Sequence, residues 1–132
     1  MYLIVDITQR EGFNLVCAEP DSSGTFFVDE KYFPWQTEKL LLAMKEIVAA
    51  QGTAFAKLRG MAMSSSQSFT ATRAAAVLLN TIGQIHDIPV AFIESGDLVS
   101  GADQILSKKK KFEPISPKYS RRPNITLSKK II

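Results

Sequence analysis

The sequence predicts an α/β domain in which a mixed sheet is flanked by helices. Short apolar segments separated by turns open the chain, and connections of this length favour an antiparallel meander. After residue 36 the apolar residues recur at helical spacing, and helix-like and strand-like segments then alternate, which is typical of domains with parallel strands. The 132 residues are 45% hydrophobic, enough for the core of one domain.

The first three strands are expected within residues 2–29. Tyr2–Val5 is short, apolar and rich in β-branched residues. Because Asp6 follows directly, we expect it at the carboxyl end of a buried strand, facing the crevice. Phe13–Ala18 and Thr25–Asp29 are the next two strand candidates, with turn residues before and between them.

A helix is expected at Thr37–Gln51, with Thr37 as its N-cap and Gly52 after its last residue. Its apolar stripe at helical spacing consists of Leu40, Leu41, Met44, Ile47 and Val48. Leu42 lies off that stripe and is a candidate exposed apolar residue.

The remaining elements complete the sheet. Leu58–Met63 is expected to be a strand, Phe69–His86 a helix, and Ile88–Ile93 a last strand. A final helix is expected at Ser95–Ser107, with Asp97 near its start. Three strands followed by helix, strand, helix, strand and helix describe a ribonuclease-H-like domain with a five-stranded mixed sheet, which we place at residues 1–107.

The basic residues are concentrated at the end of the chain. Residues 108–132 hold nine of the sixteen lysines and arginines and a single acid, a formal charge of +8, whereas residues 1–107 carry −5. Prolines favour an extended conformation for this segment. It is either a solvated linker or a segment that contacts RNA phosphates. In the second case the contacts would come from Lys108, Lys109, Lys110, Lys111, Arg121 and Arg122.

The single cysteine, Cys17, lies in an apolar segment. It is expected to be a buried thiol, and a chain with one cysteine forms no intramolecular disulfide, which fits a reduced cytoplasmic setting. The sequence does not open with a basic segment and a long apolar run, and its apolar stretches are far shorter than about 18 residues. We therefore expect neither export nor a membrane span.

The sequence offers little for the catalytic chemistry that such domains host. Two-metal phosphodiester cleavage needs several converging carboxylates, and Asp6 is the only one expected at a strand end. No serine lies in a nucleophile elbow, and the single histidine, His86, is expected to cap a helix C-terminus. The Cys and His spacing supports no metal site. Neither a catalytic residue nor a cofactor is predicted.

The polar junction Ser65–Arg73 connects an expected strand to an expected helix. Amides at a helix N-terminus bind anions, but a close approach to phosphate usually relies on glycine, and Ser64–Ser68 contains none. Consecutive serines before a helix are also ordinary capping residues. Anion binding and helix capping both remain open for this junction.

The order and spacing of these segments resemble the TsaB (YeaZ) family, bacterial accessory proteins for making threonylcarbamoyladenosine in tRNA. The family opens with a strand leading to Asp-Thr-Ser-Thr, where this chain has Asp6, Ile7, Thr8 and Gln9. Its signature Gly-Pro-Gly-Ser-Phe-Thr-Gly-Leu-Arg aligns without gaps with Ser65–Arg73. Ser68, Phe69, Thr70 and Arg73 match, and the three glycines are replaced by Ser65, Gln67 and Ala71. The segment Pro117–Pro123 is similar to the Pro-x-Tyr-x-Arg ending of the family.

The resemblance implies a single lobe of the actin-like ATPase superfamily, because family members usually have two lobes and this chain has room for one. It also implies a scaffold that pairs, through helices of its first lobe, with the paralogous catalytic subunit TsaD, which an ATPase, TsaE, joins. Those helices correspond to Thr37–Gln51 and Phe69–His86. Without a second lobe and the glycines, ATP hydrolysis by this chain alone is not expected. A vestigial nucleotide site would comprise Asp6, Thr8, Ser65 and Ser68.

The leading hypothesis is a noncatalytic TsaB-like subunit that pairs with a TsaD-type protein or with itself. The expected interface residues on the two helices are Leu40, Leu41, Met44, Phe69, Arg73, Ala74 and Val77. A second hypothesis is an RNA-binding module that holds tRNA through its basic tail. A third is a homodimeric interaction protein unrelated to tRNA.

Overall fold

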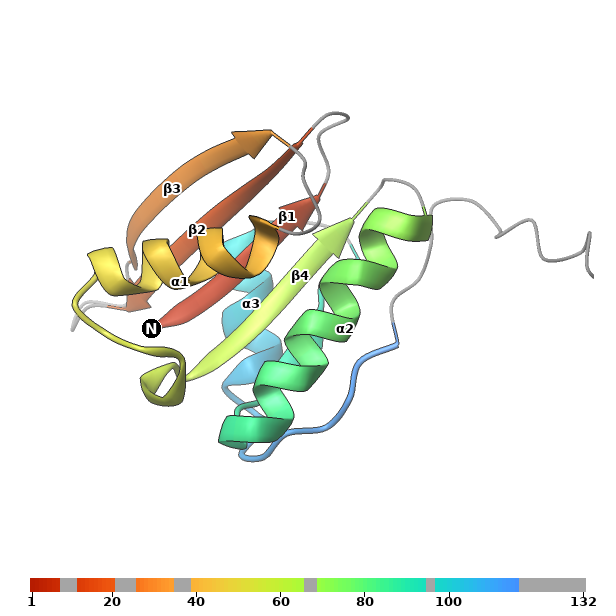
Figure 1. Cartoon of the computed structure of the whole chain (residues 1–132). Helices are drawn as coiled ribbons and strands as arrows, with labels where there is room; N and C mark the ends of the chain where they lie inside the picture. Colours follow the sequence, from red (N-terminus) through yellow and green to blue (C-terminus); the bar gives the residue numbers. More distant parts are fainter. Residues whose placement is uncertain (8–11, 21–25, 35–38, 66–68, 95–96, 117–132) are drawn as a thin grey trace, which may run out of the picture.

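Five strands form one sheet in the order β3-β2-β1-β4-β5, with α1 and α2 on one face and α3 on the other (Figure 1). This computed structural model describes residues 1–7, 12–20, 26–34, 39–65, 69–94 and 97–116. Its elements are β1 (Tyr2–Ile7), β2 (Gly12–Pro20), β3 (Phe26–Pro34), α1 (Leu40–Ala50), the short 3-10 helix η2 (Phe55–Lys57), β4 (Gly60–Ser65), α2 (Phe69–His86), β5 (Val90–Phe92) and α3 (Leu98–Leu106).

The sheet is mixed, as predicted. β1 pairs antiparallel with β2 and parallel with β4, β2 pairs antiparallel with β3, and β4 pairs parallel with β5. The expected strand at Thr25–Asp29 is longer in the structure, because β3 pairs with β2 along its whole length, from Phe26 opposite Pro20 to Pro34 opposite Gly12. The polar residues in the middle of this edge strand hide the continuation from an apolar pattern.

The central strands are buried on both faces, which explains their continuous apolar runs. Leu3, Val5 and Ile7 of β1 belong to the core beneath α1 and α2, whereas Tyr2 and Ile4 belong to the core beneath α3. Because side chains alternate between the two faces, this assignment fixes the face of the sheet on which each later side chain of the strand lies. It therefore decides the partners of the polar residues at the strand ends.

The sequence predicted the residue at the start of α3 correctly but not the one at the start of α1. α1 begins at Leu40 rather than Thr37; its N-cap residue is Lys39, which makes no side-chain cap hydrogen bond, so Thr37 is not the N-cap. Thr37 itself lies outside the described residues. α3 begins beside Asp97, whose carboxylate accepts a 2.9 Å hydrogen bond from the backbone N–H of Ser100. Aspartate at this position satisfies a helix donor that would otherwise lack a partner.

Residues 109–115, named here the strap, run from the end of α3 to the side of α2 (Figure 1). The Lys109 amine donates a 3.0 Å hydrogen bond to the Val90 carbonyl on β5. Phe112 and Ile115 pack against the core beneath α1 and α2. The segment after residue 107 thus contacts both the last strand and α2. Within the part of the chain that the structure describes, no helix is long and apolar enough to span a membrane.

Candidate interface and strand-end site

A row of buried polar side chains crosses three strands at one end of the sheet. Asp6 on β1 lies opposite Asn14 on β2 and opposite Ser64 on β4. Their side chains are 8%, 8% and 6% exposed, respectively. Because Tyr2 and Ile4 face α3 and side chains alternate along a strand, Asp6 lies on the α3 face of the sheet. The expected place of Asp6, at the carboxyl end of a buried strand, matches the structure.

The residue that follows Ser64 takes part in a different contact. The hydroxyls of Ser65, at the end of β4, and Thr72, on α2, are 2.6 Å apart and share a hydrogen bond. Thr72 is fully buried. Ser65 therefore ties the strand to the first turns of the helix on the α2 face, whereas Asp6 lies on the α3 face.

Two of the four residues that the resemblance implies for a vestigial nucleotide site, Asp6 and Ser65, are among the described residues and lie at the ends of the adjacent strands β1 and β4. Asp6 and Ser65 lie on opposite faces of the sheet, and Thr8 and Ser68 lie outside the residues that the structure describes. In the described ranges, no three His, Cys, Asp or Glu side chains are placed to hold one metal ion. What these strand ends display is a polar row on one face and a strand-to-helix contact on the other.

The expected interface on α1 needs a correction. Leu40 and Met44 are 1% and 0% exposed and belong to the core between α1 and the sheet, so they offer no surface to a partner. The prediction that they supply interface area is wrong, because the apolar stripe that marks an amphipathic helix is the stripe that its own sheet covers. Leu41, which the helical spacing placed on the stripe, lies outside its buried part and is 36% exposed, and Leu42 is 55% exposed. The exposure of Leu42 agrees with its position off the stripe.

The alanine-rich run of α2 packs mainly on its own sheet. Ala75 and Ala76 are 0% and 4% exposed, and only Ala74 is half-buried. Their small side chains let α2 lie close to β4, so these two residues pack on the sheet and offer no surface to a partner. Ala74 is the one alanine of the expected interface set, and it borders the solvent face of the helix.

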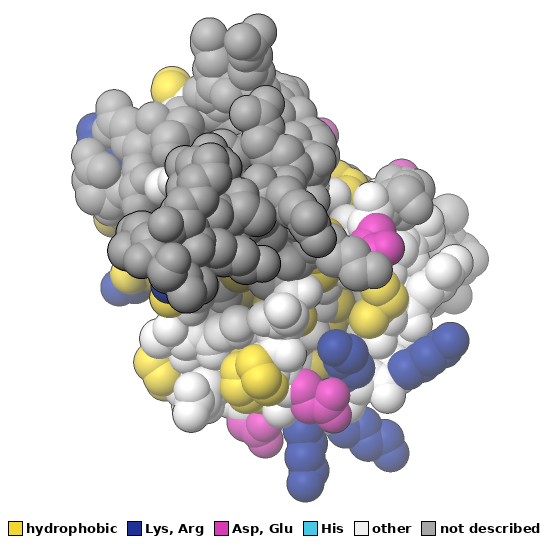
Figure 2. Space-filling view, turned by 90° about the vertical axis from the view of Figure 1, so that its right-hand side faces the viewer, with side chains coloured by type: hydrophobic (Ala, Val, Ile, Leu, Met, Phe, Trp, Pro, Cys, Tyr) yellow, Lys and Arg dark blue, Asp and Glu magenta, His cyan; other side chains and the backbone are white. Residues whose placement is uncertain are grey.

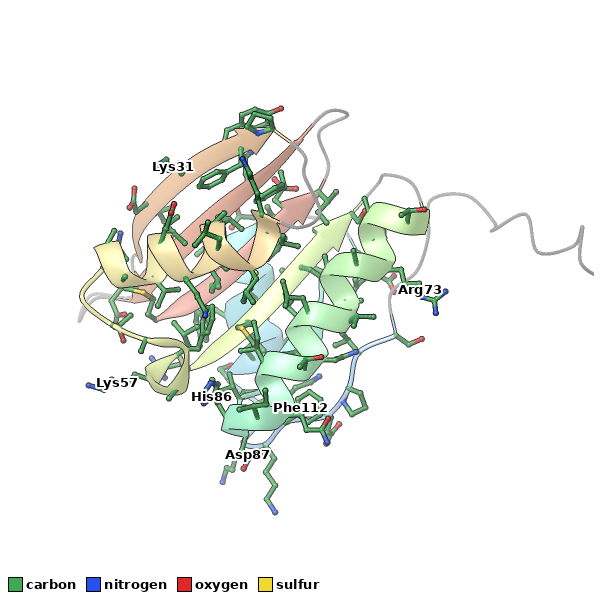
Figure 3. All side chains as sticks on the ribbon, viewed as in Figure 1. Lys31, Lys57, Arg73, His86, Asp87 and Phe112 are labelled. Atoms are coloured by element: carbon green, nitrogen blue, oxygen red, sulfur yellow. The ribbon has the colours of Figure 1, made fainter. Side chains whose placement is uncertain are left out.

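The solvent face of α2 carries an exposed cation and two exposed apolar residues, Arg73, Val77 and Ile85. Val77 is 57% exposed and Ile85 is 70% exposed. Figure 3 shows the Arg73 side chain directed away from the helix and from the sheet. Phe69 begins α2, but its side chain lies outside what the structure describes. Thus Arg73 and Val77 are exposed on the solvent face of α2, and Ala74 borders that face.

Ile85 was not predicted from the sequence. It follows Val77 by eight residues, with Thr81 between them, and this i, i+4, i+8 spacing places all three on one side of a helix. The signal was present, but an isoleucine near the end of a helix is more often a core residue. Only the position of the sheet shows that this side faces solvent.

The strap lies beside this solvent face. The Asn80 side chain bonds both backbone groups of Ile115, and an Asp87 carboxylate oxygen accepts a 3.0 Å hydrogen bond from the Phe112 N–H. Figure 3 places Asp87 and Phe112 together at the end of α2 where His86 lies. Asp87 has a positive φ of 52° and ends the helix, a conformation that aspartate tolerates better than most residues.

The four lysines at residues 108–111 differ in their exposure. Lys108, Lys110 and Lys111 are exposed, whereas Lys109 is half-buried with its amine on the Val90 carbonyl. Figure 2 shows the side of the molecule with α2 and the strap, where basic (Lys or Arg) and acidic side chains are mixed and hydrophobic side chains are scattered. Of the six residues predicted to contact phosphate, Lys108, Lys110 and Lys111 are thus exposed, and Arg121 and Arg122 lie outside the described residues.

The core holds the only cysteine of the chain. Cys17 is 2% exposed on β2, beneath α1. Burial raises the pKa of its thiol to about 11, because the apolar surroundings disfavour the thiolate, with a smaller contribution from the Asp29 carboxylate. Cys17 is therefore unreactive as a nucleophile in the folded protein.

No protein-family model and no curated protein sequence matches this chain. Among solved structures, YeaZ from Pseudomonas aeruginosa is similar over 80% of this chain and 51% of its own, with a TM-score of 0.56 and 18% sequence identity. A second structure, of an uncharacterized protein with similarity to peptidase YEAZ from Pseudomonas aeruginosa, is similar over 79% of this chain and 48% of its own, with a TM-score of 0.56 and 19% identity.

The chain thus spans about half the length of the solved structures that it resembles. A TM-score of 0.56 over about 80% of this chain shows that the fold is shared. The prediction of a ribonuclease-H-like α/β domain with a five-stranded mixed sheet is confirmed. The chain has the YeaZ fold over about half of that protein's length.

Proposed function

We propose that this chain is a noncatalytic interaction subunit of the TsaB type, which uses the solvent face of α2 to pair with a TsaD-type protein in making threonylcarbamoyladenosine in tRNA. The single observation that carries the proposal is the exposed set Arg73, Val77 and Ile85 on a helix of a domain with the YeaZ fold. Protein–protein interfaces typically have an apolar centre with a polar rim, and arginine is enriched in them. Exposed apolar residues beside an arginine fit a small interface of this kind. Leu41 and Leu42 on α1 supply the further apolar area.

The noncatalytic part of the proposal rests on the chemistry that the strand ends carry. Acid-base or two-metal catalysis requires carboxylates that converge on one point. Asp6 and Ser65 lie on opposite faces of the sheet, and the junction sequence has serine and alanine where close approach to phosphate would favour glycine. Binding to a partner places no such demand on these residues.

Co-purification with the TsaD-type protein of the same organism tests the proposal. Wild-type protein is expected to retain the partner, and Val77→Glu is expected to weaken binding by about tenfold or more, because it places a charge in the apolar part of the interface. Gln104→Glu on α3 is the matched control, since Gln104 is also exposed and receives the same charged residue. Equal binding by both variants would exclude the α2 face as the interface.

The tRNA step has its own test. A strain without this gene is expected to lose threonylcarbamoyladenosine from its tRNA, and wild-type protein but not Val77→Glu is expected to restore it. Normal modification in that strain would show that the interaction serves another purpose. The binding result would then stand while the assignment to tRNA modification would fall.

RNA binding is the second candidate, and one observation favours it. Lys108, Lys110 and Lys111 are exposed close to one another in sequence, at the start of the segment with a charge of +8. Such a cluster binds phosphates through the release of counterions, so its affinity falls steeply with salt. Direct binding of tRNA at several salt concentrations distinguishes this candidate from a purely protein-binding role.

A further inference from the structure

The two edges of the sheet differ in the contacts that the other described residues make with them. β5 forms one edge with only three residues, and the Lys109 amine of the strap occupies its Val90 carbonyl. β3 forms the other edge with nine residues, Phe26–Pro34. None of the strands that the structure describes pairs with its outer side. A long open edge presents a row of backbone donors and acceptors to another strand, and proteins usually shorten or cover such edges.

The middle of β3 also exposes apolar side chains. Val28 and Tyr32 are 43% and 46% exposed, and both lie on the α3 face of the sheet with Glu30 between them. On the α1 face lie Asp29, opposite the buried Cys17, and Lys31, opposite the buried Leu15. Asp29 is half-buried, and one of its carboxylate oxygens, Oδ2, accepts a 2.5 Å hydrogen bond from the side-chain amide of Gln51, which leaves the other oxygen for a contact across the edge. Figure 3 shows Lys31 on the outermost strand of the sheet. The open edge therefore offers apolar residues on one face and one charge of each sign on the other.

We propose that the outer edge of β3 pairs antiparallel with β3 of a second copy of this chain, in the register that places Glu30 opposite Glu30 of the second copy. In this register Asp29 of each copy lies opposite Lys31 of the other, and Val28 lies opposite Tyr32. The pairing joins the two five-stranded sheets into one continuous sheet of ten strands. Opposite charges and apolar pairs directly across two strands stabilise them.

Charge complementarity selects this register. A shift by two residues in either direction places Asp29 opposite Asp29, or Lys31 opposite Lys31, and loses the opposite-charge pairs. A shift by one residue sets the α1 face of one copy beside the α3 face of the other, because side chains alternate between faces. Only the proposed register combines two opposite-charge pairs with two apolar pairs.

The Glu30 pair is the one unfavourable contact in this arrangement. Two carboxylates directly opposite each other repel, so they weaken the dimer and limit its association to high protein concentration. Removing this charge is therefore expected to strengthen association. Few substitutions on a surface have that effect, which makes Glu30 a discriminating position.

A charge exchange measured by analytical ultracentrifugation tests the pairing. Asp29→Lys or Lys31→Asp alone creates two like-charge pairs, and the dimer dissociation constant is expected to rise about tenfold. The double variant restores two opposite-charge pairs and is expected to return the constant to within about threefold of the wild type. Because the readout is association of folded protein, checked by circular dichroism, a loss of monomer stability cannot produce this rescue.

Glu30→Gln is the second arm of the same experiment. It is expected to tighten the dimer severalfold, and Glu113→Gln is the control with the same change of charge at an exposed position on the strap. A wild-type chain and a Glu30→Gln variant that both remain monomeric at millimolar concentration would overturn the proposal. Equal effects of the two variants would overturn it as well.

Disulfide formation between the two copies tests the register of the β3 pairing directly. Residue 30 is the only position that faces its own copy, so Glu30→Cys is expected to form a disulfide-linked dimer under mild oxidation. Val28→Cys is the control, because the two copies of residue 28 would lie about 14 Å apart, beyond the reach of a disulfide. The native Cys17 does not compete, since it is buried. Cross-linking by both variants, or by neither, would contradict this register.

These measurements distinguish the β3 pairing from the proposed pairing through α2. A dimer that is sensitive to Val77→Glu but indifferent to the exchange at positions 29 and 31 would place self-association on α2 and overturn the β3 pairing. A dimer with the reverse sensitivity would support the β3 pairing and leave the binding of a TsaD-type protein to its own test.

Discussion

The side-chain amide of Asn80 on α2 is hydrogen-bonded to both backbone groups of Ile115 on the strap. Nδ2 donates to the Ile115 carbonyl at 3.1 Å, and Oδ1 accepts from the Ile115 N–H at 2.8 Å. These residues are 35 positions apart in the sequence. One side chain thus supplies the partners that a neighbouring strand would otherwise give to an extended segment. The contact makes residues 109–115 part of the folded domain rather than of a free tail.

Replacing Asn80 tests this anchor. Asn80→Ala removes both hydrogen bonds and is expected to lower the free energy of unfolding by about 1–2 kcal/mol, measured by urea denaturation. Gln84→Ala is the control, because Gln84 is exposed on the same helix and such a change is usually worth less than about 0.5 kcal/mol. Faster hydrogen exchange at the Ile115 amide, with unchanged exchange in α2, would locate the effect. Equal losses in both variants would refute the anchor.

Gly83 provides the space in which the strap packs. A Cβ at this position would lie 2.7 Å from the Phe112 ring and 3.0 Å from the Ile88 carbonyl oxygen. Gly83→Ala is therefore expected to destabilise the protein by about 1–3 kcal/mol, although alanine favours a helix more than glycine does. The same substitution in a Phe112→Ala background should cost clearly less. A double-mutant cycle without coupling would show that Phe112 does not press on α2.

The four lysines of the run are expected to separate into two kinds. Lys109→Ala removes the hydrogen bond to Val90 and is expected to lower stability by about 1 kcal/mol with little change in tRNA affinity. If the run binds RNA, the triple alanine variant of Lys108, Lys110 and Lys111 should weaken tRNA binding and reduce the slope of log affinity against log salt by about two to three. An unchanged slope would exclude phosphate contacts by these three residues.

Cys17 makes stability depend on pH in the alkaline range. The thiol has a pKa of about 11 in the folded protein and 9.0 when exposed, so the unfolded state loses its proton first. The contribution of Cys17 is fully present below pH 9 and is lost as the pH rises from 9 towards 11, which thermal unfolding across this range would detect. The Cys17→Ala variant should lose less stability than the wild type between pH 9 and 11. An identical pH profile in the variant would refute the contribution of Cys17.

Thiol reactivity gives an independent measurement on the same residue. A disulfide reagent at pH 8 is expected to modify Cys17 only as the protein unfolds, because the thiol is 2% exposed. Val28→Cys provides an exposed comparison, and its added thiol should react at once in the folded protein. Rapid modification of the wild type would contradict the burial of Cys17.

The sequence predicted the order and type of all five strands and of α1, α2 and α3. Its periodicity marked α2 with the bounds that the structure has, Phe69–His86, because a long helix with small residues on its buried side has a strong pattern. Asp6 and the aspartate before α3 were also found where expected. These features depend on neighbours in the sequence, which a pattern can record.

Other features depended on which surfaces meet in space. Leu40 and Met44 have the same apolar character as Leu41 and Leu42, and only the position of the sheet makes the first pair core and the second pair surface. The alternation of side chains sent Asp6 and Ser65 to opposite faces, which a list of polar residues at strand ends does not reveal.

The order of apolar and charged residues along this chain by itself determined an α/β domain with a basic end, because hydrophobic period and charge are local properties of the sequence. Only the tertiary structure decided that the strap bonds to α2 and to the edge strand β5, whereas no strand of the described residues pairs with the outer side of β3. Hydrogen bonds between residues far apart in the chain, such as Asn80 with Ile115, form only once packing brings their groups together. Which surfaces of the domain are available to a partner follows from that packing.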